Sequence, residues 1–266
     1  MNKNTGIPFR SAFPFRTGSG VCALLLSLIF SAAGADLPSA DEVRARLSQG
    51  NERYAADQPQ HPHAGRARRS EVAAGQHPLA TVISCSDSRV PPEVLFDQGI
   101  GDLFIIRVIG NIGGADETGS AEYGVEHLGT PLLLVLGHTR CGAVTAAVTH
   151  AALHGNIPPL VAHIRPAVDA AHREHPELKG AELVPAAISA NVRQSMAELF
   201  RRSAVIRDHV RAGKLKVVGA VYDIESGRVE WLGEHPQQTA LLASHKGSNS
   251  SGRRAVHPAK GGTVHH

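Results

Sequence analysis

Two short segments of the chain carry side chains that can bind a metal ion. Residues 85–89 read Cys-Ser-Asp-Ser-Arg, and residues 138–141, which begin 53 positions after Cys85, read His-Thr-Arg-Cys. Each segment follows an apolar run that is typical of a buried strand, at 79–84 and at 132–137. Because consecutive strands of a parallel sheet end at the same edge, the two segments can meet there. The side chains that would converge are Cys85, Asp87, His138 and Cys141.

These four side chains suit tetrahedral zinc, which binds thiolates, imidazoles and carboxylates at about 2.0–2.3 Å. Arg89 lies two residues after Asp87, where its guanidinium can hold the carboxylate through two hydrogen bonds and compete with the metal for it. The pattern therefore predicts a catalytic zinc, one ion per chain, with a coordination position that can open.

The first 35 residues are typical of a secretory signal peptide. Their only charges are basic, and the apolar run from residue 21 to about 33 is too short for a transmembrane helix, which needs roughly 20 residues. Small residues occupy positions 33–35. We therefore predict cleavage after Ala35, a periplasmic or secreted protein, and no stable membrane anchoring after cleavage.

The net charge of the whole chain is +3, but residues 36–266 hold 24 basic and 24 acidic side chains. A neutral mature chain gives no charge-based case for binding nucleic acid or an anionic membrane.

Export allows a second interpretation of the cysteines. Cys85 and Cys141 are the only cysteines after residue 35, and an even pair in an oxidising compartment is typical of a disulfide. A structural disulfide needs neither His138 beside one thiol nor an Asp-Arg pair beside the other, so zinc is favoured. A non-catalytic, disulfide-bonded binding module remains the alternative from a different class.

The remaining chain alternates strands and helices, which predicts a parallel sheet covered on both faces. A capping box at Ser39 and Glu42 begins a helix that extends to about residue 56. Its apolar stripe is thin, so we expect it to pack outside its own domain, on a partner subunit. The predicted strands are 79–84, 103–108, 132–137, 215–223 and 228–232, and the predicted helices are 72–75, 120–128, one from 142, one ending at 174, and 182–212.

Three further segments complete the organisation, which we predict as one domain over residues 36–235. Residues 57–70 are rich in Pro, His and Arg and predict a loop. Residues 110–114 lack the spacing of a dinucleotide fingerprint and predict a tight turn near the metal site. Residues 236–266 have few core-forming side chains, so we predict a disordered tail.

The C-x-D-S-R…H-x-x-C pattern resembles that of β-class carbonic anhydrases, and the resemblance covers about residues 39–233. It implies a zinc enzyme that interconverts carbon dioxide and bicarbonate. It also implies an α/β fold: a four-stranded parallel sheet in the order 2-1-3-4 with a short antiparallel fifth strand, flanking helices and an N-terminal helical arm. Members of the family form homodimers or tetramers.

The resemblance assigns roles to particular residues. Cys85, His138 and Cys141 match the zinc ligands, and Asp87 and Arg89 match a catalytic dyad. Asp87 would bind the metal itself only in a closed state. Gln76 matches a glutamine that hydrogen-bonds substrate across the dimer interface, and Tyr123 falls near a pocket aromatic.

The implied mechanism is attack of zinc-bound hydroxide on carbon dioxide, with Asp87 orienting the nucleophile and Arg89 keeping Asp87 ionised. Two thiolates make zinc a weaker acidifier than three histidines do, so we expect activity to rise on the alkaline side of neutrality. Hydrolysis of carbon disulfide or carbonyl sulfide on the same fold is the nearest alternative.

The sequence departs from members of the family in which bicarbonate favours the closed state beside a Trp, an Arg and a Tyr. Arg107 and Tyr222 match two of these residues, but Val82 occupies the tryptophan position and the only Trp is Trp231. This departure argues against switching by bicarbonate, and because Gln76 is present we expect an open site at neutral pH.

Overall fold

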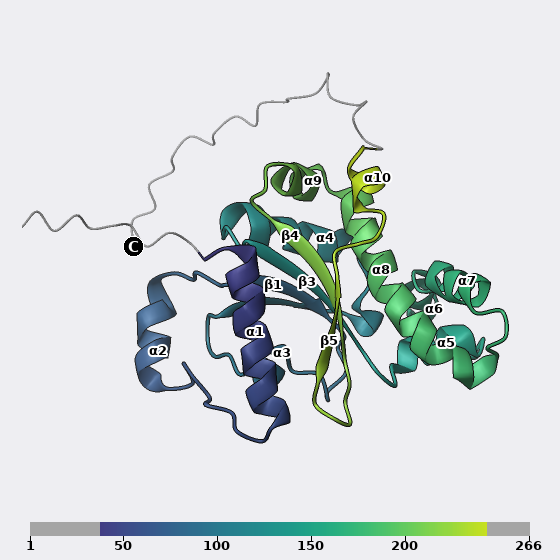
Figure 1. Cartoon of the computed structure of the whole chain (residues 1–266), viewed down its shortest axis with the longest axis horizontal. Helices are drawn as coiled ribbons and strands as arrows, with labels where there is room; N and C mark the ends of the chain where they lie inside the picture. The colour runs from purple at the N-terminus through teal and green to yellow at the C-terminus, as the bar shows by residue number, and fades with distance from the viewer. Residues whose placement is uncertain (1–37, 244–266) are drawn as a thin grey trace, which may run out of the picture. The chain divides into compact units, whose positions relative to one another are not determined.

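The computed structural model describes residues 38–243 of the 266-residue chain (Figure 1). The predicted signal peptide, residues 1–35, and positions 244–266 of the predicted tail lie outside the described residues.

A five-stranded sheet forms the centre of the domain, in the order β2-β1-β3-β4-β5. The first four of these strands are parallel and the fifth is antiparallel to its neighbour, which confirms the predicted fold. The strands are β1 (Ala80–Ser84), β2 (Leu103–Arg107), β3 (Leu132–His138), β4 (Lys216–Tyr222) and β5 (Val229–Gly233).

The two central strands are apolar because helices cover both faces of the sheet. Every residue of β1 and β3 is buried. Successive side chains point to opposite faces, so Ile83 belongs to one hydrophobic core and Val82 to the other. The sheet is therefore the middle layer of three, as expected for parallel strands.

Most helices pack on the core that contains Ile83. They are α4 (Ala115–Glu122), α5 (Gly142–Val148), α6 (Ile157–Ala162), α7 (Arg165–Glu174), α8 (Val184–Arg202) and α9 (Ala204–Arg211). The helices α1 (Ala40–Ala55) and α3 (Pro92–Leu95) cover the opposite face. Short elements complete the described chain: α2 (Arg66–Glu71), α10 (Gln238–Ala243), 3-10 turns at Val72–Ala74, Ile109–Asn111 and Gly180–Leu183, and a π-helix at Tyr123–His127.

The N-terminal helix α1 begins as predicted, with a reciprocal capping box between Ser39 and Glu42. The expectation that it packs outside its own domain is wrong. Val43 and Leu47 are buried against the sheet of the same chain, in one core with Val82. Four buried positions on a thin stripe are sufficient because the helix contacts the flat face of a sheet (Figure 1).

Three other segments differ from their predictions. The predicted helix over 182–212 is interrupted at Ser203, whose backbone is extended and whose Oγ accepts a hydrogen bond from Ile206 N–H as the N-cap of α9. The helix α10 lies within the predicted disordered tail and packs on the core through Leu241 and Leu242. The predicted loop 57–70 contains most of α2.

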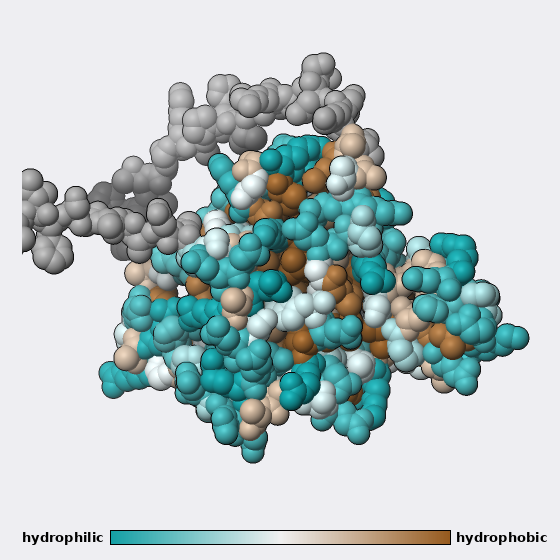
Figure 2. All heavy atoms as spheres, in the orientation of Figure 1, coloured by the Kyte–Doolittle hydropathy of each residue, from teal (hydrophilic) through white to brown (hydrophobic). Residues whose placement is uncertain are grey.

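On the face drawn in Figure 2, most of the surface is hydrophilic, and apolar atoms show between α1 and α8, where β4 and β5 lie. Among the described residues, no helix combines the length and apolar content required to cross a bilayer.

Candidate metal centre

The carboxyl ends of β1 and β3 bring the two predicted segments together. Ser84, the last residue of β1, pairs with Leu136 of β3, so Cys85 emerges beside the end of β3, where His138 is the last strand residue. Cys141 follows after a short turn and is the N-cap of α5. Strands β1 and β3 are neighbours whose connections leave in opposite directions, which is where open α/β sheets place their ligands.

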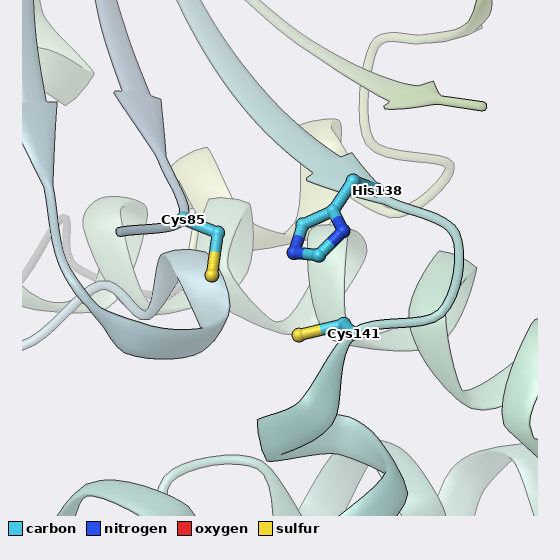
Figure 3. A group of neighbouring side chains, drawn as sticks. All are labelled: Cys85, His138 and Cys141. Atoms are coloured by element: carbon cyan, nitrogen blue, oxygen red, sulfur yellow. The ribbon is translucent and has the colours of Figure 1, made fainter. Parts of the chain in front are cut away.

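Cys85, His138 and Cys141 form a single buried group (Figure 3). Their potential ligand atoms all lie within 4.8 Å of one another, and their exposed fractions are 4%, 0% and 2%. The side chains point toward one another in Figure 3. This is the arrangement that a tetrahedral metal with two sulfur ligands and one nitrogen ligand requires.

The hydrogen bond of His138 determines which ring nitrogen faces the thiols. Nδ1 lies 2.9 Å from the main-chain carbonyl of Thr139, so Nδ1 carries the proton and donates it. Nε2 is buried and has no hydrogen-bond partner among the described residues. A buried nitrogen without a partner is costly, and a metal ion bound at Nε2 removes that cost.

The two thiols differ in the direction in which their pKa is shifted. Hydrogen bonds from Cys141 and from the Gly110 N–H lower the pKa of Cys85 to about 4, despite its burial. The contact with Cys85, together with burial, raises the pKa of Cys141. Cys85 is therefore a thiolate at neutral pH, and the thiolate is the form that binds metals.

Asp87 and Arg89 form a dyad beside the three ligands. Arg89 donates from Nε to one carboxylate oxygen of Asp87 at 2.9 Å and from Nη2 to the other at 2.7 Å, and its main-chain N–H adds a third bond. The guanidinium holds the pKa of the Asp87 carboxyl well below its usual value. Asp87 Oδ2 lies 3.9 Å from His138 Nε2, so an ionised carboxylate borders the metal position.

Two residues outside the predicted set hold Cys85 in place. The main-chain N–H of Gly110 donates to Cys85 Sγ at 3.3 Å, and Asn191 of α8 donates to the Gly110 carbonyl at 2.8 Å. Gly110 has φ +72°, and a Cβ there would lie 2.7 Å from Ile164, so this turn requires glycine. The tight turn predicted at 110–114 is confirmed. Asn191 was missed, because an asparagine within an amphipathic helix pattern gives no local signal of its partner.

Arg107 supports the same loop. Its Nε donates to the Cys85 carbonyl at 3.1 Å and its Nη2 to the Asp87 carbonyl at 2.6 Å. Tyr222, the other residue matched to the bicarbonate-responsive members, shares a hydrogen bond with Tyr54, and burial raises its pKa. Val82 is fully buried in the core beneath α1, and Trp231 packs against Phe96.

Within one chain, neither Gln76 nor Tyr123 is brought to the metal centre. Gln76 is exposed before the amino end of β1, whereas Cys85 follows its carboxyl end, about 16 Å away for a five-residue strand. Tyr123 is 48% exposed and stacks against Phe104 of β2 and against His127.

Comparison with known proteins identifies the family. Residues 80–229, more than half of the chain, match the model of the carbonic anhydrase family. Carbonic anhydrase 2 of Mycobacterium tuberculosis is 38% identical over 199 residues, which cover 72% of this chain and 93% of the relative.

The chain belongs to the β-class carbonic anhydrase family. The β-carbonic anhydrase CafA of Aspergillus fumigatus superposes with a TM-score of 0.61 at 28% identity, over 76% of this chain and 97% of that one. One of two tetrameric β-carbonic anhydrases of Sordaria macrospora gives a TM-score of 0.58 at 26% identity, over 73% and 98%. The metal implied by this β-carbonic anhydrase family is zinc, and the two thiols and the free Nε2 of His138 fit it.

Proposed function

We propose that the chain is an exported, zinc-dependent carbonic anhydrase that hydrates carbon dioxide reversibly to bicarbonate and a proton. One observation carries the proposed activity. A buried Cys-His-Cys group with a free imidazole nitrogen lies beside a carboxylate that an arginine holds ionised.

Zinc bound by Cys85, His138 and Cys141 would lower the pKa of a water molecule toward about 7 and so supply a nucleophile near neutral pH. The chain's own residues orient the attacking water molecule. The carboxylate of Asp87 only accepts hydrogen bonds, so it fixes the direction of the attacking water's hydrogen and leaves a lone pair for carbon dioxide. Arg89 prevents Asp87 from taking up a proton at neutral pH.

The dyad also favours the open form of the site. Both carboxylate oxygens of Asp87 are held by Arg89, so a movement of Asp87 onto the metal would have to break these hydrogen bonds. Val82 in place of the family's tryptophan removes one residue of the bicarbonate-responsive set. Arg107, which would be another, is already bonded to the main chain of Cys85 and Asp87.

We infer that two copies of the chain associate through β2. It is an edge strand, and among residues 38–243 nothing pairs with its outer side. The exposed apolar side chains Ile100, Ile109 and Tyr123 lie beside it in sequence or in contact. An unprotected strand edge with apolar neighbours is a template for pairing. Gln76 and Tyr123 would then contribute to the metal centre of the partner chain. The Sordaria relatives are tetrameric, so association of two such dimers is compatible with the family.

The proposal of export rests on the composition of residues 1–35. Expression of the full chain in a bacterial host, followed by amino-terminal sequencing of the periplasmic fraction, should yield a chain that begins at Asp36. Recovery of an uncleaved chain from the cytoplasm would contradict it.

The alternatives lack support. Cys85 and Cys141 are free thiols, so the disulfide-bonded module has no basis in the structure. The relatives described above are carbonic anhydrases, and turnover of carbon disulfide or carbonyl sulfide can be compared directly with hydration.

The decisive experiment is stopped-flow hydration of carbon dioxide by the zinc-loaded chain, with Asp87→Asn as the variant. Asparagine keeps the shape but adds a donor, so kcat should fall about 10²- to 10⁴-fold, with one zinc per chain retained. Asp208→Asn, at an exposed position of α9, is the matched control and should leave the rate unchanged. Unchanged hydration in Asp87→Asn would refute the mechanism, and a zinc-loaded wild type that does not hydrate carbon dioxide would refute the activity.

A further inference from the structure

A hollow of about 500 Å³ lies outside the metal centre, between α7, α8 and the segment that follows β5. Alanines of both helices line it at positions 167, 170, 190 and 197. Because an alanine side chain ends at Cβ, the two packed helices leave space between them. The volume is in the range of pockets that bind small molecules.

The side chains around this hollow are mainly cationic. Arg173 of α7 and Arg193 and Arg201 of α8 line it, against one acidic side chain, Glu174. Arg201 is paired with Glu198 at 2.8 Å. The side chains of Arg173 and Arg193 have no hydrogen bond or ion pair with any residue between 38 and 243. Two guanidinium groups that form no ion pair among these residues therefore line one hollow, which also contains Glu174.

His235, on the segment after β5, lies in the same positively charged environment. Burial lowers its pKa, and the charges of Arg193 and Arg201 lower it further. Its Nδ1 accepts the main-chain N–H of Gln237 at 3.0 Å, so the neutral ring carries its hydrogen on Nε2 and can donate it. Gln194 and Gln237 add amide groups to the lining.

We propose that this hollow, between Arg173, Arg193 and His235, is a binding site for a small multivalent anion that carries phosphoryl or carboxylate groups. Guanidinium groups bind both kinds of group through paired hydrogen bonds. The chain's own carboxyl-terminal stretch is a poor occupant, because residues 244–266 contain no Asp or Glu. None of the lining residues belongs to the metal centre, so the proposed site is distinct from it.

Isothermal titration calorimetry of the zinc-loaded protein at constant ionic strength tests the site. Two probes separate the two chemistries: inorganic phosphate, and benzene-1,3,5-tricarboxylate, whose carboxylates are too far apart to chelate one metal ion. We expect saturable binding of at least one probe, weakened about tenfold by Arg173→Gln and by Arg193→Gln individually. Arg165→Gln, at an exposed arginine of α7 outside the hollow, should bind as the wild type does.

The stronger probe identifies the ligand class, and either outcome supports the site. The proposal is wrong if neither probe binds saturably, or if the double variant Arg173→Gln/Arg193→Gln binds as tightly as the wild type, which would place the anion at the metal centre. Circular dichroism and zinc content verify that each variant is folded. Arg193→Lys provides a second measurement, because it keeps the charge and loses only the paired geometry.

Discussion

Asp87 and Arg89 show how single side chains control the chemistry of the centre. Only 17% of the Asp87 side chain is exposed, and this burial by itself raises the pKa of the carboxyl. Arg89 lowers that pKa and also fixes where the two oxygens point. Arg89 therefore has two effects, because it keeps Asp87 ionised against the effect of burial and it orients the carboxylate.

Arg89→Lys separates charge from orientation. Lysine keeps the positive charge but cannot bond both oxygens in parallel, so the carboxylate becomes free to rotate. We expect hydration to fall about 100-fold, as misplacement of a positioning group does, with zinc content unchanged. Arg140→Lys in the adjacent loop is the control, because that guanidinium bonds Glu225 and not Asp87. An equal loss in both variants would indicate a general effect on the loop.

Among the secondary-structure elements, α8 supports the metal centre without supplying a metal ligand. Its residue Asn191 holds the Gly110 carbonyl, and the Gly110 N–H in turn donates to Cys85 Sγ. Hydrogen bonds to a ligand's sulfur orient it and adjust its basicity.

Asn191→Ala should therefore weaken zinc binding by about tenfold while the fold is kept. Competition with a chromogenic zinc chelator measures this change directly, and Asn156→Ala, at an exposed N-cap of α6 whose side chain makes no capping bond, is the control. Zinc affinity equal to that of the wild type would show that the Gly110 turn is maintained without Asn191.

The loop between α1 and α2 is held by the buried carboxylate of Asp97, which accepts hydrogen bonds from Arg53 and from the main-chain N–H groups of Gln60 and His61. Burial raises the pKa of Asp97, but these bonds together lower it below its usual value. A lowered pKa means that the carboxylate stabilises the fold at pH above about 3.9, and that this contribution is lost as pH falls through the folded-state pKa.

Asp97→Asn should cost about 1–3 kcal/mol near neutral pH, because it removes a charged acceptor while asparagine still tolerates the positive φ of this position. The difference between wild type and variant should shrink as pH is lowered from about 6 to about 3. Urea unfolding at each pH tests this, and Asp116→Asn, exposed in the first turn of α4, is the control. A difference that does not change with pH would contradict the role of the ionised carboxylate.

At the scale of the whole molecule, local sequence patterns predict most of the sheet and the metal ligands. They do not predict features that depend on contacts between residues distant in the sequence. The strands were predictable because burial on both faces requires continuous apolar runs, and strand order places Cys85 beside His138. The position of α1 was not predictable, since a thin stripe of apolar side chains does not show which surface the helix packs against. The helix α10 depends on packing against α8, whereas the break at Ser203 is set by a local cap that the prediction missed. The roles proposed for Gln76 and Tyr123 would require a second chain.

A variant at the outer edge of β2 tests the proposed association of two chains. Val108 N–H donates to Ser84 and the Asp102 carbonyl accepts from Leu79, so residues 102 and 108 face β1 and, by alternation, the Ile105 amide faces outward. Ile105→Pro removes that outward donor without breaking a bond to β1, and we expect a monomer by sedimentation velocity. Hydration should fall with it, because Gln76 of a neighbour would no longer reach the site.

Ile105→Ala is the matched control for this variant. It removes more side-chain packing than proline does but keeps the amide, so it should remain associated. The comparison distinguishes strand pairing from simple loss of apolar surface. If the proline variant sediments as the wild type does, with unchanged circular dichroism, the chains associate elsewhere. Dissociation of both variants alike would assign the association to side-chain packing of Ile105 instead of to its main-chain N–H.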